Sequence, residues 1–489
     1  MEHIAGARRV PAAADPAALG FDADKLAGTR RLIQKYIDRG KIAGAVSLVA
    51  RRGQVAQLLA VGHAELESGT PMAPDTLFRI FSLTKPVTSV AALMLVERGL
   101  LALDAPVEEY IPAFRGIQVF VGQENGRLVT EPARRPPTVR HLLTQTSGIA
   151  GTAMPPAEPL AALYREARIG DESLTLEETV NRLARIPLLF HPGERWRYGV
   201  STDVLARVIE VASGMHFGDF LREHVFAPLG MHDTGFTVPA DKRHRLAALY
   251  SPSPSGGLRP MRGLNPAAGP AAAPAAGGAA APAAGVAAAP AAGVAGPTAG
   301  PTAVSTAGPT TGPTTGPVAA PTAGPAAGAS PADKLGPRPS PAGGVTGPVL
   351  QSGSSGLVST VLDYYRFAQM LLDGGTFGER RLLHPETVAA MRHNQLPDNL
   401  LPYQLPWPHT ARYTRGCGFG FGVRVVLDVQ QWGVPGSVGE FGWAGAANTY
   451  LWIDPAQQVV TLMFAQAFPF MHTSLDTEFK ALVYEALRG

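Results

Sequence analysis

The sequence predicts an α+β protein in which strands from both ends of the chain build one antiparallel sheet and the helices between them form a separate all-α lobe. Three observations predict this. Strand patterns occur near the N-terminus and again after residue 420, helical patterns dominate about 87–236, and a stretch rich in Ala, Gly, Pro and Thr interrupts the chain at 252–349. Strands at both ends with helices between them are typical of a sheet with a helical layer beside it.

The first part of the chain reads as a tail, a helix and a hairpin. Residues 1–20 are rich in Ala and Pro, and we expect them to be flexible. Residues 26–40 have apolar side chains at helical spacing, which predicts an amphipathic helix. Two β-type runs at 43–50 and 54–61 flank the turn Arg51-Arg52-Gly53, so we expect a hairpin. We therefore place a single folded domain at 21–251 and 350–489.

A short stretch at 81–86, with the sequence FSLTKP, links a β-type run at 76–80 to a helical pattern. The apolar residues that follow recur at i, i+3, i+4 and i+7, and Gly99 stands where a left-handed cap is expected. Pro86 is compatible with this helix because a proline in the first turn removes at most one backbone hydrogen bond. The pattern predicts a helix that begins near Ser82.

Ser82 and Lys85 are three residues apart, so a helix places them on one face. A serine hydroxyl becomes a good nucleophile only when a base takes its proton. A lysine is such a base if burial or a neighbouring cation keeps it neutral. The helix N-terminus adds N–H groups where an oxyanion would develop. The alternative interpretation is a helix cap followed by a solvated lysine.

The middle of the chain has helical patterns at 138–146, 176–186 and 201–213, and broken helical turns at 100–114. Tyr198 comes just before the last of these helices and should reach out from the helical lobe. Near a serine nucleophile, its phenol can pass a proton to a leaving group. A packed aromatic side chain is the alternative.

The stretch at 252–349 has almost no large apolar residues, so burial cannot offset the entropy lost on ordering. We expect a disordered insert that leaves from a surface loop, with a spacer or docking segment as the alternative. After it, a helix is predicted at 361–372, with Thr360 and Asp363 as a capping box. Strands are predicted at 420–427, 448–453 and 459–464, and a final helix at 476–487.

Trp443-Ala444-Gly445 begins the predicted strand at 448–453. Small residues at a strand edge let a substrate approach the backbone closely. The N–H of the next residue, Ala446, is placed to complete an oxyanion hole with that of Ser82. A plain turn is the alternative interpretation.

Composition excludes several function classes. The net charge is +3 and no basic stripe alternates with aromatic residues, so nucleic acid is not expected as a partner. The lone Cys417 precludes an intrachain disulfide, and we interpret it as a packing residue rather than a thiol nucleophile. Metal-binding H-E-x-x-H and phosphate-binding motifs are missing, so no metal or cofactor is expected. Neither a signal peptide nor a membrane span is apparent, which predicts a cytoplasmic protein.

Ser82-x-x-Lys85, Tyr198 and Trp443-Ala444-Gly445 occur in an order that resembles the serine β-lactamase and penicillin-binding protein superfamily. The chain looks most like its class C-like branch, which includes the family VIII carboxylesterases and the lovastatin-type acyltransferases. The phrases HLLTQTSG at 141–148 and YGVSTD at 198–203 support this resemblance. It implies a β-lactamase-like fold with the site between the two lobes, Ser82 as the acylated nucleophile, and Lys85 and Tyr198 as its partners. Which partner takes the first proton stays open.

Two departures from the β-lactamase pattern favour an ester substrate. Val200 stands where β-lactamases often have Asn, and Trp443 stands where a Lys or His normally receives the antibiotic's carboxylate. Trp-x-Gly is the form seen in family VIII esterases. We therefore expect a serine carboxylesterase that acts on a small ester or amide, with Trp443, Phe419 and Tyr450 lining an apolar acyl or alcohol pocket.

Alternatives within the same fold are an acyltransferase, a weak β-lactamase that uses Arg415 or Arg424 as its cation, and a D-amino-acid peptidase. A non-catalytic binding protein with this fold is the alternative from another class. The natural substrate and the oligomeric state are not predicted.

Overall fold

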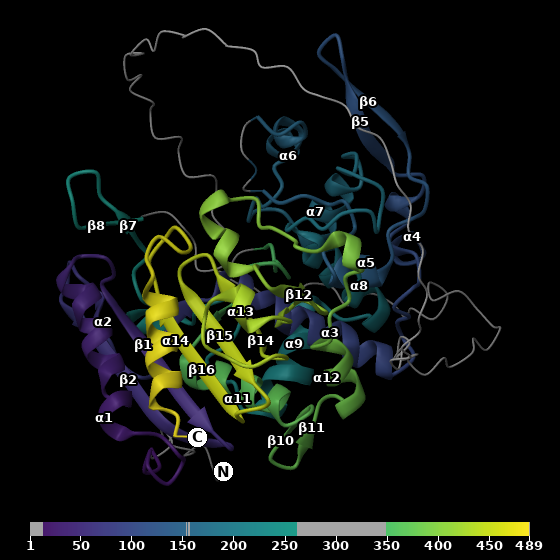
Figure 1. Ribbon diagram of the computed structural model, residues 1–489. Coiled ribbons are helices and arrows are strands. Elements are labelled where there is room, and N and C mark those ends of the chain that lie inside the picture. The colour runs from purple at the N-terminus through teal and green to yellow at the C-terminus, as the bar shows by residue number, and fades with distance from the viewer. Residues whose placement is uncertain (1–12, 153, 155–156, 262–348, 489) are drawn as a thin grey trace, which may run out of the picture. The chain divides into compact units, whose positions relative to one another are not determined.

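An eight-stranded antiparallel sheet joins the two ends of the chain (Figure 1). The computed structural model describes residues 13–152, 154, 157–261 and 349–488. Strand β1 (Gly44–Arg51) lies between β2 (Gln54–Glu65) and β16 (Val459–Ala465) and is antiparallel to both. The prediction of one sheet built from both termini is confirmed.

The sheet runs in the order β12-β13-β14-β15-β16-β1-β2-β3. The C-terminal strands are β12 (Cys417–Phe419), β13 (Arg424–Val426), β14 (Phe441–Gly445) and β15 (Thr449–Asp454), and β3 (Thr70–Pro71) ends the other edge. Every residue of β1, β14, β15 and β16 is buried. Burial of both side-chain orientations means that both faces of the sheet are covered.

Helices from both ends of the chain pack on this sheet. Near the N-terminus, α1 (Ala23–Leu26) and α2 (Gly28–Asp38) lie beside the C-terminal α14 (Leu475–Ala486), as Figure 1 shows. The hydroxyl of Tyr36 in α2 donates to Glu478 in α14 at 2.7 Å. Helix α11 (Val361–Leu372) packs against β16 and β1.

The helical lobe is built around α3 (Thr84–Glu97) and α8 (Ser201–Ser213), which pack against each other. Both α8 and α11 have the bounds that the sequence predicts. The remaining described α-helices are α4 (Val107–Tyr110), α5 (Val139–Leu143), α6 (Ala161–Glu166), α7 (Leu176–Leu183), α9 (Phe217–Leu221), α10 (Ala227–Leu229), α12 (Pro385–Met391) and α13 (Val429–Trp432).

The helical lobe also contains a hairpin that the sequence interpretation missed. Strands β5 (Gln118–Glu124) and β6 (Arg127–Pro132) pair antiparallel within the region expected to be mainly helical. Asn125 and Gly126 connect them with φ values of 49° and 76°. An Asn-Gly pair in this conformation is a strong hairpin signal, so the turn was visible in the sequence.

Three features of the C-terminal part differ from the prediction. The range 420–427, expected as one strand, contains the turn after β12 and then β13, because the chain reverses at Gly422, whose φ is 78°. Trp443, Ala444 and Gly445 lie on β14 and not at the start of the next strand, because Asn448 turns the chain with a φ of 60°. Thr360 caps α11 as predicted, but the Asp363 carboxylate accepts from the N–H of Asp233 instead of completing a box.

The two segments expected to be disordered are only partly described. From the N-terminal segment, Ala14 donates its N–H to Val55, and Leu19 is buried. From the expected insert at 252–349, residues 252–261 belong to the hairpin of β7 (Tyr250–Pro252) and β8 (Leu258–Pro260). Residues 262–348 lie outside the described residues. Across the described ranges, no helix has the length and apolar character that a membrane crossing requires.

Candidate active site

Ser82 lies in a single 3-10 turn, η1 (Phe81–Leu83), directly before α3. The α-helix therefore begins two residues later than predicted, and the turn carries the serine. Phe81 has a φ of 45°, which is uncommon for a bulky residue, and its ring is buried. Such a conformation persists only where the surrounding structure enforces it, and residues that adopt it are found mainly at active sites.

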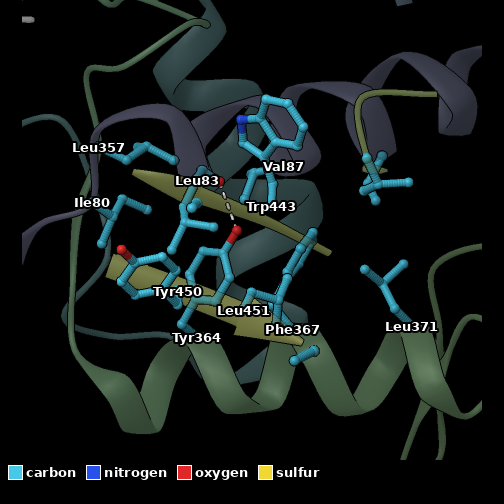
Figure 2. Packing of buried hydrophobic residues seen from close by; sticks show 14 of the residues in the cluster. Ile80, Leu83, Val87, Leu357, Tyr364, Phe367, Leu371, Trp443, Tyr450 and Leu451 are labelled. Carbon is cyan, nitrogen blue, oxygen red and sulfur yellow. Dashed lines mark hydrogen bonds between the residues drawn. The ribbon is translucent and has the colours of Figure 1, made fainter. Parts of the chain in front are cut away.

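Tyr364 of α11 supports this turn from below, as Figure 2 shows. Its buried hydroxyl donates to the carbonyl of Leu83 at 2.6 Å. Ile80, Leu83 and Leu357 pack around it in the same core. The turn with the serine is therefore fixed by the packed interior of the sheet.

Gly445 allows the end of β14 to approach this turn closely. A Cβ atom at Gly445 would lie 2.3 Å from the carbonyl oxygen of Ile80 and 2.2 Å from Oγ1 of Thr449. Only glycine fits this contact, because real Cβ atoms do not approach other atoms so closely. The contact brings the next residue, Ala446, to the same cavity as Ser82.

A cavity of about 210 Å³ joins the predicted site residues. Six of the eight line it, namely Ser82, Lys85, Tyr198, Trp443, Gly445 and Ala446. They come from η1, α3, the segment before α8, and β14 with the residue after it. Three distant parts of the chain therefore line the same cavity as Ser82. That they act together on its hydroxyl stays a prediction.

Lys85 is buried at the cavity wall, with 2% of its surface exposed. Its Nζ donates to the carbonyl of Ser354 at 2.9 Å and lies 4.5 Å from the centre of the Tyr198 ring. The lysine and the tyrosine are therefore in direct contact.

Tyr198 is held between two hydrogen bonds to Gln145. The N–H of Arg197 donates to the Gln145 carbonyl at 2.9 Å, and the N–H of Gly199 donates to its Oε1 at 3.0 Å. Gln145 is buried and has a φ of 59°. Trp443 completes the arrangement, since its Nε1 lies 3.4 Å from the Tyr198 hydroxyl and is oriented to donate to it. Gln145 stands in the predicted HLLTQTSG phrase, but its role was not foreseen.

Phe419 and Tyr450 do not line the cavity, which contradicts the prediction. Phe419 is fully buried behind Trp443, and the two ring centres are 5.3 Å apart. Tyr450 stacks on Trp452, and its hydroxyl donates to Asn448 Oδ1 at 2.7 Å. Phe419 also packs against the rings of Trp196 and Tyr403, so both aromatic side chains are held away from the cavity by other partners.

Other aromatic residues take their place at the cavity. Phe81, Trp407, Tyr413, Phe468 and Phe470 line it together with Leu405, Met154 and two prolines. Trp407 and Phe470 come from loops that the sequence interpretation did not single out. The clusters LPWP at 405–408 and FPF at 468–470 were the available signal, because apolar side chains in loops need a partner surface.

Neither arginine proposed as a carboxylate receptor lines the cavity. Arg424 is fully buried between the rings of Tyr413 and Trp432, and its Nη2 lies 3.8 Å from Glu440. Arg415 is exposed elsewhere. Arg197 does line the cavity, but its Nη2 is paired with Glu158 at 2.8 Å.

Two other chemistries find little support in the part of the chain that the structure describes. Burial raises the pKa of the Cys417 thiol to about 11, which is the opposite of what a reactive thiolate requires. Among the described residues, no cluster of three or more His, Cys, Asp or Glu side chains is arranged to hold a metal ion.

The family model called Beta-lactamase matches residues 29–485. This chain belongs to the β-lactamase family. The uncharacterized protein MT1414 of Mycobacterium tuberculosis is 29% identical over 449 residues, which cover 91% of this chain and 90% of that protein. Esterase EstB of Burkholderia gladioli is 38% identical over 237 residues, which cover 47% of this chain and 57% of EstB.

Solved structures show the same fold. EstCE1, described as a hydrolase with promiscuous acyltransferase activity, superposes with a TM-score of 0.67 at 25% identity and covers 94% of this chain and 99% of its own. Simvastatin synthase LovD from Aspergillus terreus superposes with a TM-score of 0.68 at 21% identity, covering 96% of this chain and 100% of its own. The β-lactamase-like α+β fold is thus confirmed for this member of the family, which is related to esterases and acyltransferases.

Proposed function

We propose that this protein is a serine carboxylesterase that forms an acyl-enzyme on Ser82. The observation that carries the proposal is that Ser82, Lys85, Tyr198 and the backbone of Ala446 line one cavity. These groups are what acyl transfer needs: a nucleophile, a base, and N–H donors for an oxyanion.

The reaction proceeds in two halves. The Ser82 oxygen attacks the ester carbonyl while its proton passes to Tyr198 or Lys85, and the N–H groups of Ser82 and Ala446 stabilise the oxyanion. The C–O bond to the alcohol then breaks, and the alcohol leaves with that proton. Water attacks the acyl group in the same manner, which releases the acid and returns the proton to Ser82.

The lining of the cavity favours a neutral, apolar ester over a β-lactam. Trp443 occupies the place where the family's β-lactamases carry a cation, and the one arginine among the described lining residues is already paired with Glu158. Aromatic rings from five segments line the wall. An acyl or alcohol group with an apolar surface is buried favourably there. EstB, the relative named above, is an esterase.

A panel of p-nitrophenyl esters of increasing chain length tests this function, with Ser82→Ala as the matched control. We expect turnover that disappears in the variant. A serine-directed fluorophosphonate should add its mass to the wild-type chain and not to Ser82→Ala. A folded wild type that neither turns over any ester nor takes up the probe would mean that the protein is a non-catalytic binder with this fold.

Acyl transfer to an alcohol is the second candidate function. Monacolin J acid methylbutanoyltransferase of Aspergillus terreus is 33% identical over 190 residues, which cover 36% of this chain. An apolar cavity wall disfavours water as the acceptor. Adding a small alcohol to the ester assay separates the two activities, because a transferase yields the new ester while a hydrolase yields only the acid. A chromogenic cephalosporin in the same assay measures any β-lactamase activity.

A further inference from the structure

A buried carboxylate stands behind the lysine of the site, and the reaction proposed above gives it no role. Asp203 lies in the first turn of α8, with 4% of its surface exposed. It does not line the cavity. A buried carboxylate is costly unless hydrogen bonds and a nearby positive charge compensate it, so its partners indicate its role.

The hydrogen bonds that Asp203 accepts lead directly to Lys85. Its Oδ1 accepts from Ser352 Oγ at 2.8 Å and from the N–H of Ser354 at 2.9 Å. The carbonyl of Ser354 in turn accepts from Lys85 Nζ at 2.9 Å. One residue, Ser354, therefore connects the carboxylate to the amine through its own peptide groups.

The segment around Ser354 packs closely against α8. A Cβ atom at Gly353 would lie 2.4 Å from the carbonyl oxygen of Thr202. The hydroxyls of Thr202 and Ser354 are 2.8 Å apart. The carbonyl that receives Lys85 is therefore held in place by α8, and Asp203 provides two of the bonds that hold it.

The charges near Asp203 also support a role for it beside Lys85. Burial raises the pKa of the Asp203 carboxyl, while the bonds from Ser352 and Ser354 and the charge of Lys85 favour its ionised form. The titratable and charged side chains that line the described cavity are Lys85, Tyr198, Arg197, His409 and Tyr413. Arg197 is paired with Glu158, and His409 contacts the carbonyl of Phe470.

We infer that Asp203 is a positioning residue for Lys85, fixing the Ser354 carbonyl that receives the amine and balancing its charge from behind the cavity. The inference rests on the proposed function, since it assigns Asp203 to the same proton-transfer site. Asp203 ends the YGVSTD phrase that begins with Tyr198, but the sequence interpretation gave it no role.

The variant Asp203→Asn removes the negative charge of the side chain while it leaves the hydrogen-bonded oxygen in place. Both bonds that Asp203 accepts end on Oδ1, so an asparagine oxygen keeps them while the negative charge is lost. Asp363→Asn is the matched control, because Asp363 is equally buried, also accepts backbone and hydroxyl bonds, and lies away from the cavity lining.

The measurement is the rate at which a fluorophosphonate labels Ser82 from pH 5 to pH 10. Whichever of Lys85 and Tyr198 takes the proton, losing a nearby negative charge makes that group lose its own proton at lower pH. We expect the acid limb of the Asp203→Asn profile to move to lower pH by at least half a unit. The Asp363→Asn profile should coincide with that of the wild type.

A folded Asp203→Asn variant whose profile coincides with the wild-type profile overturns the inference. If Asp203→Asn does not fold, Ser352→Ala replaces it, since losing this hydrogen bond loosens the carboxylate from the segment that receives Lys85 and should displace the acid limb. A Ser352→Ala profile that coincides with wild type then overturns the inference. Failure of the proposed function is a different result, in which wild-type Ser82 takes up no probe at any pH.

Discussion

At the scale of single residues, the Tyr198 hydroxyl can be removed without its ring. This change tests the role of Tyr198 in proton transfer separately from its role in substrate binding. Its ring packs against Trp443 and Trp407, and those contacts survive when only the hydroxyl is lost. A positioned acid or base contributes typically 10²–10⁴-fold to the rate. We expect Tyr198→Phe to lower kcat for p-nitrophenyl esters by about that factor and to change KM little.

Tyr365→Phe is the control for this measurement, since the Tyr365 hydroxyl donates to the carbonyl of Gly53 in the turn between β1 and β2 and does not line the cavity. It should retain wild-type kcat. A Tyr198→Phe variant with near wild-type kcat would assign the whole proton transfer to Lys85.

Gly445 makes a second residue-scale prediction. An alanine there would place a methyl group against the Ile80 carbonyl, and backbone atoms cannot yield as a flexible side chain does. We expect Gly445→Ala to displace β14 from the serine turn and to slow probe labelling of Ser82 at least tenfold, because misplaced oxyanion donors cost about 10²–10³ in rate.

Gly122→Ala provides the comparison, because a Cβ at this half-buried β5 position meets nothing within 4 Å. Its labelling rate should match the wild type. Unchanged labelling in Gly445→Ala would show that the close approach of β14 does not matter for acylation.

At the scale of elements, α5 depends on a neutral histidine. Thr138 and His141 form a capping box in which the N–H of Thr138 donates to His141 Nδ1 at 3.1 Å. Burial lowers the pKa of His141 to about 4, with a smaller contribution from Arg135 in the same direction. Protonation removes the Nδ1 acceptor, so the box holds only while the ring is neutral.

The direction of the pH dependence follows from these values. The unfolded chain binds a proton near pH 6.5 and the folded one only near pH 4, so this stabilisation is complete above pH 6.5 and is lost as the pH falls towards 4. His141→Gln keeps a side-chain acceptor for the box without titrating. We expect the urea midpoint of the variant to change less between pH 7.5 and pH 5 than that of the wild type. Equal changes in the two proteins would rule out His141 as the source.

Elements with a strong local pattern were predicted well, and those defined by tertiary contacts were not. The helices α8 and α11 have periodic apolar faces, and their bounds agree with the prediction. The β5–β6 hairpin was missed because broken helical turns precede it, although its Asn-Gly turn is a clear signal. The range 420–427, expected as one strand, contains a turn because Gly422 allows a reversal that an unbroken apolar pattern conceals.

The site residues also divide into those that a local sequence pattern reveals and those that only tertiary contacts bring to the cavity. Ser82, Lys85, Tyr198 and Trp443 occur in short patterns that carry their chemistry, and all four line the cavity. Phe419 and Tyr450 were predicted to line the pocket with Trp443, but neither of them lines the cavity. Trp407 and Phe470 reach the cavity from distant loops, and Asp203 reaches Lys85 through another segment, so spacing along the chain does not reveal them.

At the scale of the whole molecule, a buried ionic cluster ties the sheet to the last helix. Glu440, Lys480 and Arg424 are all fully buried, with Lys480 Nζ 2.7 Å from Glu440 Oε1. Removing one partner of a buried ion pair typically costs about 3–5 kcal/mol, because the other charge is left uncompensated. We expect Lys480→Met to lower the free energy of unfolding by about that amount.

Urea unfolding of the single variants Lys480→Met and Glu440→Gln and of the double variant Glu440→Gln/Lys480→Met tests this. The double variant should regain part of the loss, since no buried carboxylate is left without its ammonium. If the double variant is destabilised by the sum of the two single changes, the pair is not coupled and the cluster does not act as a unit.

The position of β1 between β2 and β16 has a consequence for biosynthesis. A ribosome delivers β1 and β2 together, but β16, the neighbour that completes β1, emerges only after the helical lobe has been made. Until then the hairpin exposes a row of unsatisfied N–H and C=O groups beside apolar side chains, a surface prone to pairing with other chains. Nascent chains stalled before residue 459 should therefore bind holdase chaperones, and full-length chains should release them.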